Sequence, residues 1–228
     1  MYITVNGNRL YYEKHGAGRP LIMLHGNGED HTIFDRAWPL LRKGFCCYLV
    51  DSRSHGQSEE GELHYEDMAK DMFCFLEMLD LRDAIFYGFS DGGIIGLLTA
   101  ARTRRVSTLI VSGVNLSPNG IGLWTRIKLR LAWLRTQDPK LKLMLDEPYI
   151  TDDILAGIRA NTLVLAGSRD LVRQEQTEHI AQTIPGAQLE ILTGEDHESY
   201  VVHSDKIAKL IIEYCRQTMD VVQNGEKS

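Results

Sequence analysis

Residues 83–98 constrain this chain more than any other stretch. The apolar run Ile85-Phe86-Tyr87 has strand character and leads at once into Gly88-Phe89-Ser90-Asp91-Gly92. Apolar residues then recur at helical spacing as far as Ala101. A strand, the pattern G-x-S-x-G and a helix, in this order, favour a tight turn that presents a serine hydroxyl at a helix N-terminus. The sequence therefore predicts an exposed nucleophile at Ser90. An ordinary strand-to-helix turn is the alternative.

The rest of the chain alternates between strand and helix patterns. Two strand-like runs, 2–5 and 9–13, flank Asn6-Gly7, which is a strong hairpin signal. Further strands are predicted at 20–24, 45–50, 106–114, 161–166 and 187–192, and helices at 65–80, 151–158 and 205–217. This order predicts an α/β fold: a mostly parallel twisted sheet with helices on both faces and an N-terminal antiparallel hairpin. The last residues, 224–228, are expected to fray.

The length favours a single domain over residues 1–228. Residues 115–150 interrupt the alternation and are rich in Leu, Trp, Lys and Arg, so we expect a short inserted helical cap over the carboxyl end of the sheet. Trp124, Ile127, Leu131 and Leu134 fall on one helical stripe beside a basic surface. We expect this stripe to pack over an apolar acyl pocket, which makes Trp124, Ile127 and Leu131 candidate substrate contacts. A lipid-facing amphipathic surface is the alternative.

Composition excludes several classes of function. A net charge of -6 argues against a nucleic-acid surface. No apolar stretch reaches the ~18 residues that span a bilayer, so no stable membrane insertion is expected. Met1 leads directly into a strand pattern without an export signal, which favours a cytoplasmic protein. The four cysteines form no C-x-x-C pair and are expected as thiols in a reducing compartment. No metal or cofactor is predicted, and the oligomeric state is left open.

A serine hydroxyl is a weak nucleophile and needs a histidine base with a carboxylate behind it. His197 follows the last predicted strand, and Asp170 follows the one before it, so both belong to carboxyl ends where such sites assemble. Asp170 alone would also fit a helix N-cap, and His197 alone would fit a solvated loop. Asp196 and Glu195 are rival acids, but they lie too close to His197 in sequence to face it well.

Two backbone N–H groups are expected to stabilise the oxyanion of the reaction. One is the N–H of Asp91, directly after the nucleophile, and the other is the N–H of Asn27, in the loop His25-Gly26-Asn27-Gly28. The same loop is compatible with a plain glycine-rich turn. It also has part of a dinucleotide fingerprint, but His31 stands where the third glycine belongs.

These motifs, together with the stretch Asp51-Ser52-Arg53-Ser54-His55-Gly56-Gln57-Ser58, resemble those of the α/β-hydrolase fold superfamily over nearly the whole chain. Ser54 departs from that pattern, which usually has glycine there. The elbow is similar to that of valacyclovirase-like (biphenyl-hydrolase-like) members, in which the aspartate after the nucleophile receives a substrate ammonium. This resemblance makes Asp91 a candidate substrate contact. A favourable charge at the helix N-terminus is the alternative role.

The resemblance implies a cofactor-independent serine hydrolase, most simply a carboxylesterase. The expected substrate is a small to medium carboxylic ester or related acyl compound, cleaved through an acyl-enzyme on Ser90. His197 would act as general base and acid, and Asp170 would orient it. A C–C bond hydrolase of the same fold and a ligand-binding receptor without turnover remain as alternatives.

Overall fold

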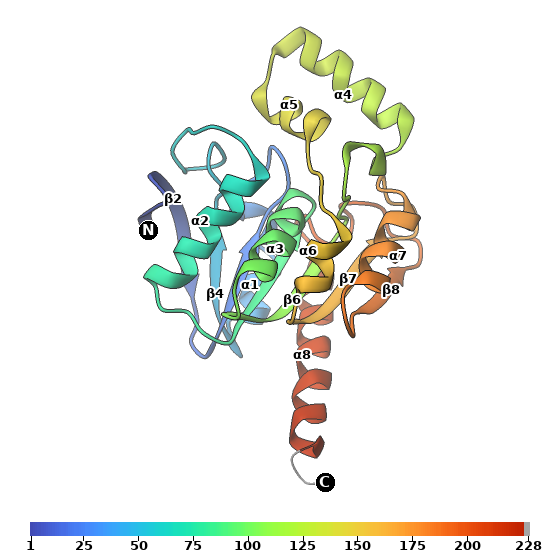
Figure 1. Cartoon of the computed structure of the whole chain (residues 1–228). Coiled ribbons are helices and arrows are strands. Elements are labelled where there is room, and N and C mark those ends of the chain that lie inside the picture. The colour runs from blue at the N-terminus through green and yellow to red at the C-terminus, as the bar shows by residue number, and fades with distance from the viewer. Residues whose placement is uncertain (226–228) are drawn as a thin grey trace.

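The computed structural model describes residues 1–225, with side chains described as far as Thr218 (Figure 1). Helix α8 continues through Gly225, and the rest of the expected frayed end, 226–228, lies outside the described residues. Among the described residues, no helix has both the length and the apolar character to span a membrane.

Eight strands form one sheet in the order β1-β2-β4-β3-β5-β6-β7-β8. They are β1 (Tyr2–Val5), β2 (Asn8–His15), β3 (Arg19–Leu24), β4 (Phe45–Val50), β5 (Ala84–Phe89), β6 (Val106–Ser112), β7 (Asn161–Gly167) and β8 (Gln188–Leu192). The β1–β2 and β2–β4 pairs are antiparallel, and β3 to β8 run parallel to one another. Asn6 and Gly7 have φ angles of 47° and 77°, as the tight hairpin turn requires. The predicted fold class is therefore confirmed.

Helices cover both faces of this sheet (Figure 1). They are η1 (His31–Phe34), α1 (Trp38–Leu41), α2 (Tyr65–Met78), α3 (Asp91–Arg102), η2 (Pro118–Gly120), α4 (Leu123–Thr136), α5 (Pro139–Asp146), α6 (Asp152–Gly157), α7 (Gln174–Thr183) and α8 (Lys206–Gly225). Side chains of α2, α3, α6 and α7 contribute to one buried cluster, and those of η1, α1 and α8 to the other. Alternate residues of the strands supply both clusters: Ile22 belongs to the first and Met23 to the second.

Residues 115–150 leave the sheet after β6 and contain η2, α4 and α5. Their two ends meet, because the backbone N–H of Ile150 donates to the carbonyl of Leu116 at 2.9 Å. Figure 1 shows α4 outermost on this excursion, with α5 next to it and the sheet beyond. Helix α6 then runs back along the sheet to β7, so the crossover between the parallel strands does not depend on α4 or α5.

The Ser54 position adopts the left-handed backbone that glycine favours, with φ of 61°. Its hydroxyl donates to the carbonyl of Gly61 and accepts from the N–H of the same residue, both at 2.9 Å. These bonds across the loop hold a serine in a conformation that costs an ordinary residue roughly 1 kcal/mol or more.

Candidate active site

Ser90 sits on a strained turn between β5 and α3, with φ of 52° and ψ of -115°. The turn requires glycines on both sides of Ser90, because the backbones of neighbouring segments approach closely there. A Cβ on Gly88 would lie 2.1 Å from the carbonyl oxygen of Gly92, and a Cβ on Gly92 would lie 2.2 Å from that of Leu24. The N–H of Ser90 donates to the carbonyl of Ser112 at 2.8 Å, which ties the turn to the end of β6. The local backbone therefore holds the serine hydroxyl at the carboxyl end of the sheet.

The structure brings the three predicted triad side chains into one hydrogen-bonded array. His197 Nε2 lies 3.1 Å from Ser90 Oγ, and His197 Nδ1 lies 2.7 Å from Asp170 Oδ1. Because a carboxylate only accepts, the imidazole carries its proton on Nδ1 and leaves Nε2 free to accept from the serine. Asp170 Oδ1 also accepts from the N–H of Val172 at 2.9 Å, which fixes the carboxylate.

The rival acids are oriented away from the imidazole. Asp196 Oδ1 accepts from the backbone N–H groups of Glu198 and Ser199, at 3.0 and 2.9 Å. Glu195 accepts from the Ser199 hydroxyl and from Lys206 Nζ. Both carboxylates therefore stabilise the loop that carries His197.

Gly113 packs against the His197 imidazole, a contact that the sequence motifs did not indicate. It follows β6 directly and has φ of 64°. A Cβ built there would lie 2.6 Å from His197 Cε1, so the imidazole packs against a bare backbone. Phe89 supports the ring from elsewhere, with ring centroids 5.0 Å apart. In the sequence, the only indication of this contact was a glycine at the carboxyl end of a predicted strand.

The two expected oxyanion donors are backbone N–H groups without a competing acceptor. The N–H of Asp91 opens helix α3 and so has no acceptor within the helix. The N–H of Asn27 donates to no acceptor among the residues that the structure describes. His25 holds this loop, because its Nε2 accepts from the N–H of Ser52 at 3.1 Å and its Nδ1 donates to the carbonyl of Gly26 at 2.7 Å. Burial lowers the pKa of His25 to about 4, which keeps the ring neutral in this role.

The carboxylate of Asp91 is occupied within the protein. It is 4% exposed, accepts from Asn27 Nδ2 at 2.8 Å, and is hydrogen-bonded to the Tyr65 hydroxyl. Burial raises the pKa of this carboxyl to about 6. Asn27 Nδ2 also lies 3.2 Å from the carbonyl of Lys140 in α5, so one amide joins the nucleophile turn, the oxyanion loop and the cap. A substrate ammonium would have to displace Asn27 to reach Asp91. This side-chain bridge was not visible in the sequence.

Glu29 places a second carboxylate beside the nucleophile. Its Oε2 accepts from the N–H of Gly26 at 2.8 Å, and a Cβ on Gly26 would lie 2.7 Å from this oxygen and 3.1 Å from Ser90 Cβ. Burial, and then the nearby Glu198, raise the pKa of Glu29 to about 7. Because Glu29 occupies the N–H of Gly26, the N–H of Asn27 is left as the loop's donor for an oxyanion.

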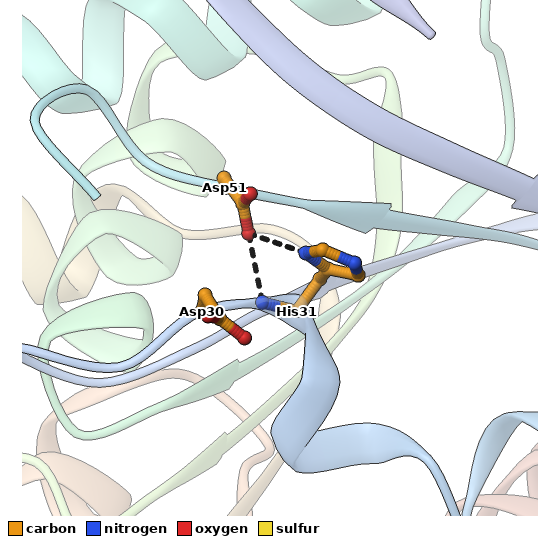
Figure 2. A group of neighbouring side chains, drawn as sticks. All are labelled: Asp30, His31 and Asp51. Carbon is orange, nitrogen blue, oxygen red and sulfur yellow. Dashed lines mark hydrogen bonds and ion pairs between the residues drawn. The ribbon is translucent and has the colours of Figure 1, made fainter. Parts of the chain in front are cut away.

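Asp30, His31 and Asp51 form a compact group with ligand atoms of the kind that hold metals. Figure 2 shows that Asp51 Oδ1 contacts both the backbone N–H and Nδ1 of His31, each at 2.8 Å. Asp51 Oδ2 accepts from the N–H of Gln57 at 2.8 Å, and Asp30 accepts from the N–H of Thr32, where it caps η1. These carboxylate oxygens already accept hydrogen bonds from the protein. The group therefore fits a structural role better than metal binding, because its bonds fix the turns after β3 and β4.

The apolar stripe on α4 faces outward, contrary to the expectation that it packs over an acyl pocket. Trp124 is 77% exposed, and the other members of the stripe are also exposed. We call these residues the α4 stripe: Leu123, Trp124, Ile127, Leu131 and Leu134. The helix has a second apolar side with Leu129 and Trp133, which are half-buried, and Trp133 lines the groove against α5. Trp124, Ile127 and Leu131 therefore do not contact the centre around Ser90 in this structure.

Comparisons with known proteins agree with this architecture. A family model described as alpha/beta hydrolase fold matches residues 19–129. AB hydrolase superfamily protein YisY of Bacillus subtilis is 40% identical over 97 residues, which are 41% of this chain and 36% of that relative. Serine hydrolase BPHL of Mus musculus is 22% identical over 246 residues, 93% of this chain and 84% of the relative. An esterase from Exiguobacterium antarcticum, a solved structure, has the same fold, with a TM-score of 0.82 at 22% identity over 95% of this chain and 99% of its own. With this sheet order and a serine turn between β5 and α3, the chain has the α/β-hydrolase fold.

Proposed function

We propose that this protein is a serine hydrolase that cleaves small to medium carboxylic esters through an acyl-enzyme on Ser90. The observation that carries the proposal is the continuous array from Ser90 Oγ through His197 to Asp170, with contacts of 3.1 and 2.7 Å. Relatives named as a serine hydrolase and as an esterase support an acyl substrate. The chemistry uses side chains and backbone donors alone.

In the acylation step, Ser90 Oγ attacks the ester carbonyl carbon while its proton passes to His197 Nε2. Asp170 stabilises the imidazolium that forms, and the N–H groups of Asn27 and Asp91 donate to the oxyanion. When the tetrahedral intermediate collapses, the C–O bond to the alcohol breaks and Nε2 returns the proton to the leaving oxygen. Ser90 then carries the acyl group and the alcohol departs.

In the deacylation step, His197 Nε2 takes a proton from water as the water oxygen attacks the acyl carbon. The same two backbone donors receive the second oxyanion. Collapse breaks the bond to Ser90 Oγ, which regains its proton from the imidazolium, and the carboxylic acid is released. The bridge from Asp91 through the Asn27 side chain keeps the two donors at a fixed separation during both steps.

A fluorophosphonate probe with intact-mass readout tests this proposal, followed by a panel of p-nitrophenyl esters. We expect a single adduct on Ser90, no adduct in Ser90→Ala, and a strong loss of ester turnover in both Ser90→Ala and His197→Ala. Asp196→Asn is the matched control, because its carboxylate is next to His197 in sequence but bonds only the local loop. The proposal is wrong if Ser90 stays unlabelled and the panel is not hydrolysed. Cleavage of a C–C substrate alone would favour that alternative, and binding without turnover would favour a receptor.

A further inference from the structure

The outer face of α4 is an apolar surface that is largely exposed among the described residues. The α4 stripe occupies one continuous arc of the helix, since its members recur at intervals of three, four and seven residues. Trp124, at 77% exposure, is the most exposed of the large hydrophobic side chains described. A run of five exposed apolar side chains on one helix face is the kind of patch that marks an interaction surface.

The opposite side of α4 already has its partner. Leu129, Ala132 and Trp133 are half-buried, and Trp133 and Leu145 line a groove of about 290 Å³ between α4 and α5. Leu123, Ile127 and Arg130 line the same groove from one edge of the stripe. Asn27 Nδ2 lies 3.2 Å from the Lys140 carbonyl, which joins α5 to the oxyanion loop. The helix therefore needs its inner side for the cap, whereas Trp124, Leu131 and Leu134 in the rest of the stripe are exposed and line no part of this groove.

The charged residues of α4 indicate what kind of surface would bind the α4 stripe. Helix α4 contains Arg126, Lys128, Arg130 and Arg135 and no acidic residue, although the whole chain carries a net charge of -6. On the helical wheel, Lys128 and Arg135 border the stripe on one side and Arg130 borders it on the other. A helix with an apolar arc between two basic borders is complementary to a surface that has an apolar interior and anionic groups at its boundary with water.

We propose that α4 is an interfacial docking helix that seats this protein reversibly on anionic lipid bilayers. The α4 stripe enters the boundary between acyl chains and headgroups, with the Trp124 indole at headgroup depth. Lys128, Arg130 and Arg135 extend along the apolar surface to the lipid phosphates. A second copy of the chain is a poorer partner for this face, because pairing two α4 helices would bring their basic borders together.

The position of the helix gives docking a consequence for the site. The bridge from Asp91 through Asn27 to α5 connects the cap to the residues around Ser90. A bilayer seated on α4 therefore lies on the cap side of the molecule, the side to which the carboxyl ends of β5 to β8 point (Figure 1). Docking brings the side of the molecule that carries Ser90 near molecules dissolved in the membrane surface. It involves no spanning helix.

Vesicle sedimentation with the full chain tests the proposal. The probes are vesicles of neutral phosphatidylcholine and vesicles in which about 30% of the lipid is phosphatidylglycerol. We expect binding to the anionic vesicles to be at least about tenfold tighter than to the neutral ones and to weaken with added salt. Trp124→Ser/Leu131→Ser should reduce anionic-vesicle binding by about tenfold or more. The matched control is Met78→Ser/Leu189→Ser, which removes exposed apolar side chains from α2 and β8.

A charge variant separates the two parts of the surface. Lys128→Gln/Arg130→Gln/Arg135→Gln should lower binding to anionic vesicles and flatten its salt dependence. The changed side chains are all exposed, so circular dichroism and Tm should match the wild type and exclude a folding defect. The proposal is overturned if anionic vesicles are not bound, or if binding is equal in the stripe and control variants. A concentration-dependent dimer that the stripe variant dissociates, without vesicle binding, would assign the face to a second copy instead.

Discussion

Asp91→Asn is the substitution for which the structure gives the most definite magnitude. The carboxyl of Asp91 is 4% exposed and is bonded to Asn27 and Tyr65, and burial raises its pKa from 3.8 to about 6. A group whose pKa is higher in the folded state contributes stability that is fully present below the unfolded pKa. That contribution is lost as pH rises through the folded value. The folded protein therefore becomes less stable, on account of this group, between pH near 4 and pH above 6.

The size of the effect follows from the two pKa values. A shift from 3.8 to about 6 corresponds to roughly 3 kcal/mol over the whole titration, of which about 2 kcal/mol falls between pH ~4 and pH ~8. An amide at this position does not ionise and has an oxygen that can still accept from Asn27. We expect the free energy of unfolding of Asp91→Asn, relative to that of the wild type, to rise by about 2 kcal/mol across this range.

Urea unfolding of both proteins at several pH values measures this difference. Glu29 titrates in a similar range, but its own contribution is present in both proteins and largely cancels in the comparison. Glu60→Gln, at an exposed position, is the matched carboxylate-to-amide control. A difference between Asp91→Asn and the wild type that stays flat across the pH range, or falls as pH rises, would refute the reasoning from burial.

Three further outcomes are expected. Gly113→Ala should lower kcat for ester hydrolysis by more than about tenfold with a small change in KM, because the added Cβ would lie 2.6 Å from His197 Cε1 and must move the imidazole; steady-state kinetics test this, and an unchanged kcat would contradict it. Asp170→Asn should keep the fold and reduce kcat by roughly 10⁴-fold, as in other Ser–His–Asp systems, since an amide favours the wrong imidazole tautomer; rates within tenfold of the wild type would exclude the assigned role. Asp71→Ala should cost about 3–5 kcal/mol in the free energy of unfolding, because it leaves the buried Arg53 guanidinium without the carboxylate that it contacts through two nitrogens at 2.6 Å; denaturant unfolding measures this, and a cost below about 1 kcal/mol would show that water replaces the carboxylate.

Local patterns predicted which side chains the structure brings together around Ser90. The glycines around Ser90 are required by contacts between a strand and the helix that follows it, so the sequence alone contains the signal. His197 and Asp170 were predicted from their places after successive strands, because parallel strands deliver their carboxyl ends to one edge of the sheet. The structure brings these side chains together at hydrogen-bonding distances, while their catalytic roles remain predictions.

Features that depend on contacts between distant segments were not predictable in the same way. The predicted packing of the α4 stripe over an acyl pocket was wrong. The helix has apolar residues around most of its circumference, and the position of α5, which the sequence does not give, decides which of them are covered. The partner of Asp91 is 64 residues away in the chain, and no local pattern connects it to Asn27. Helix α7 was not predicted, because its residues are mostly polar and Ile180 is its main contribution to the buried core.

The bond between Ile150 and Leu116 has a consequence for engineering and for divergence. This bond joins the two ends of the cap segment, so the residues between Leu116 and Ile150 leave and re-enter the rest of the structure at neighbouring points. The segments that it joins connect to β6 on one side and to α6 on the other, and these keep their register whatever the loop contains. Residues 121–149 also bond the stretch after Asp170, through Gly122 and Leu171, and the start of α2, through Glu147. An insert of different length can therefore replace only the part between these contacts, and it must keep an acceptor for Asn27. Changes in the cap would then alter substrate preference and surface attachment without changing the residues around Ser90.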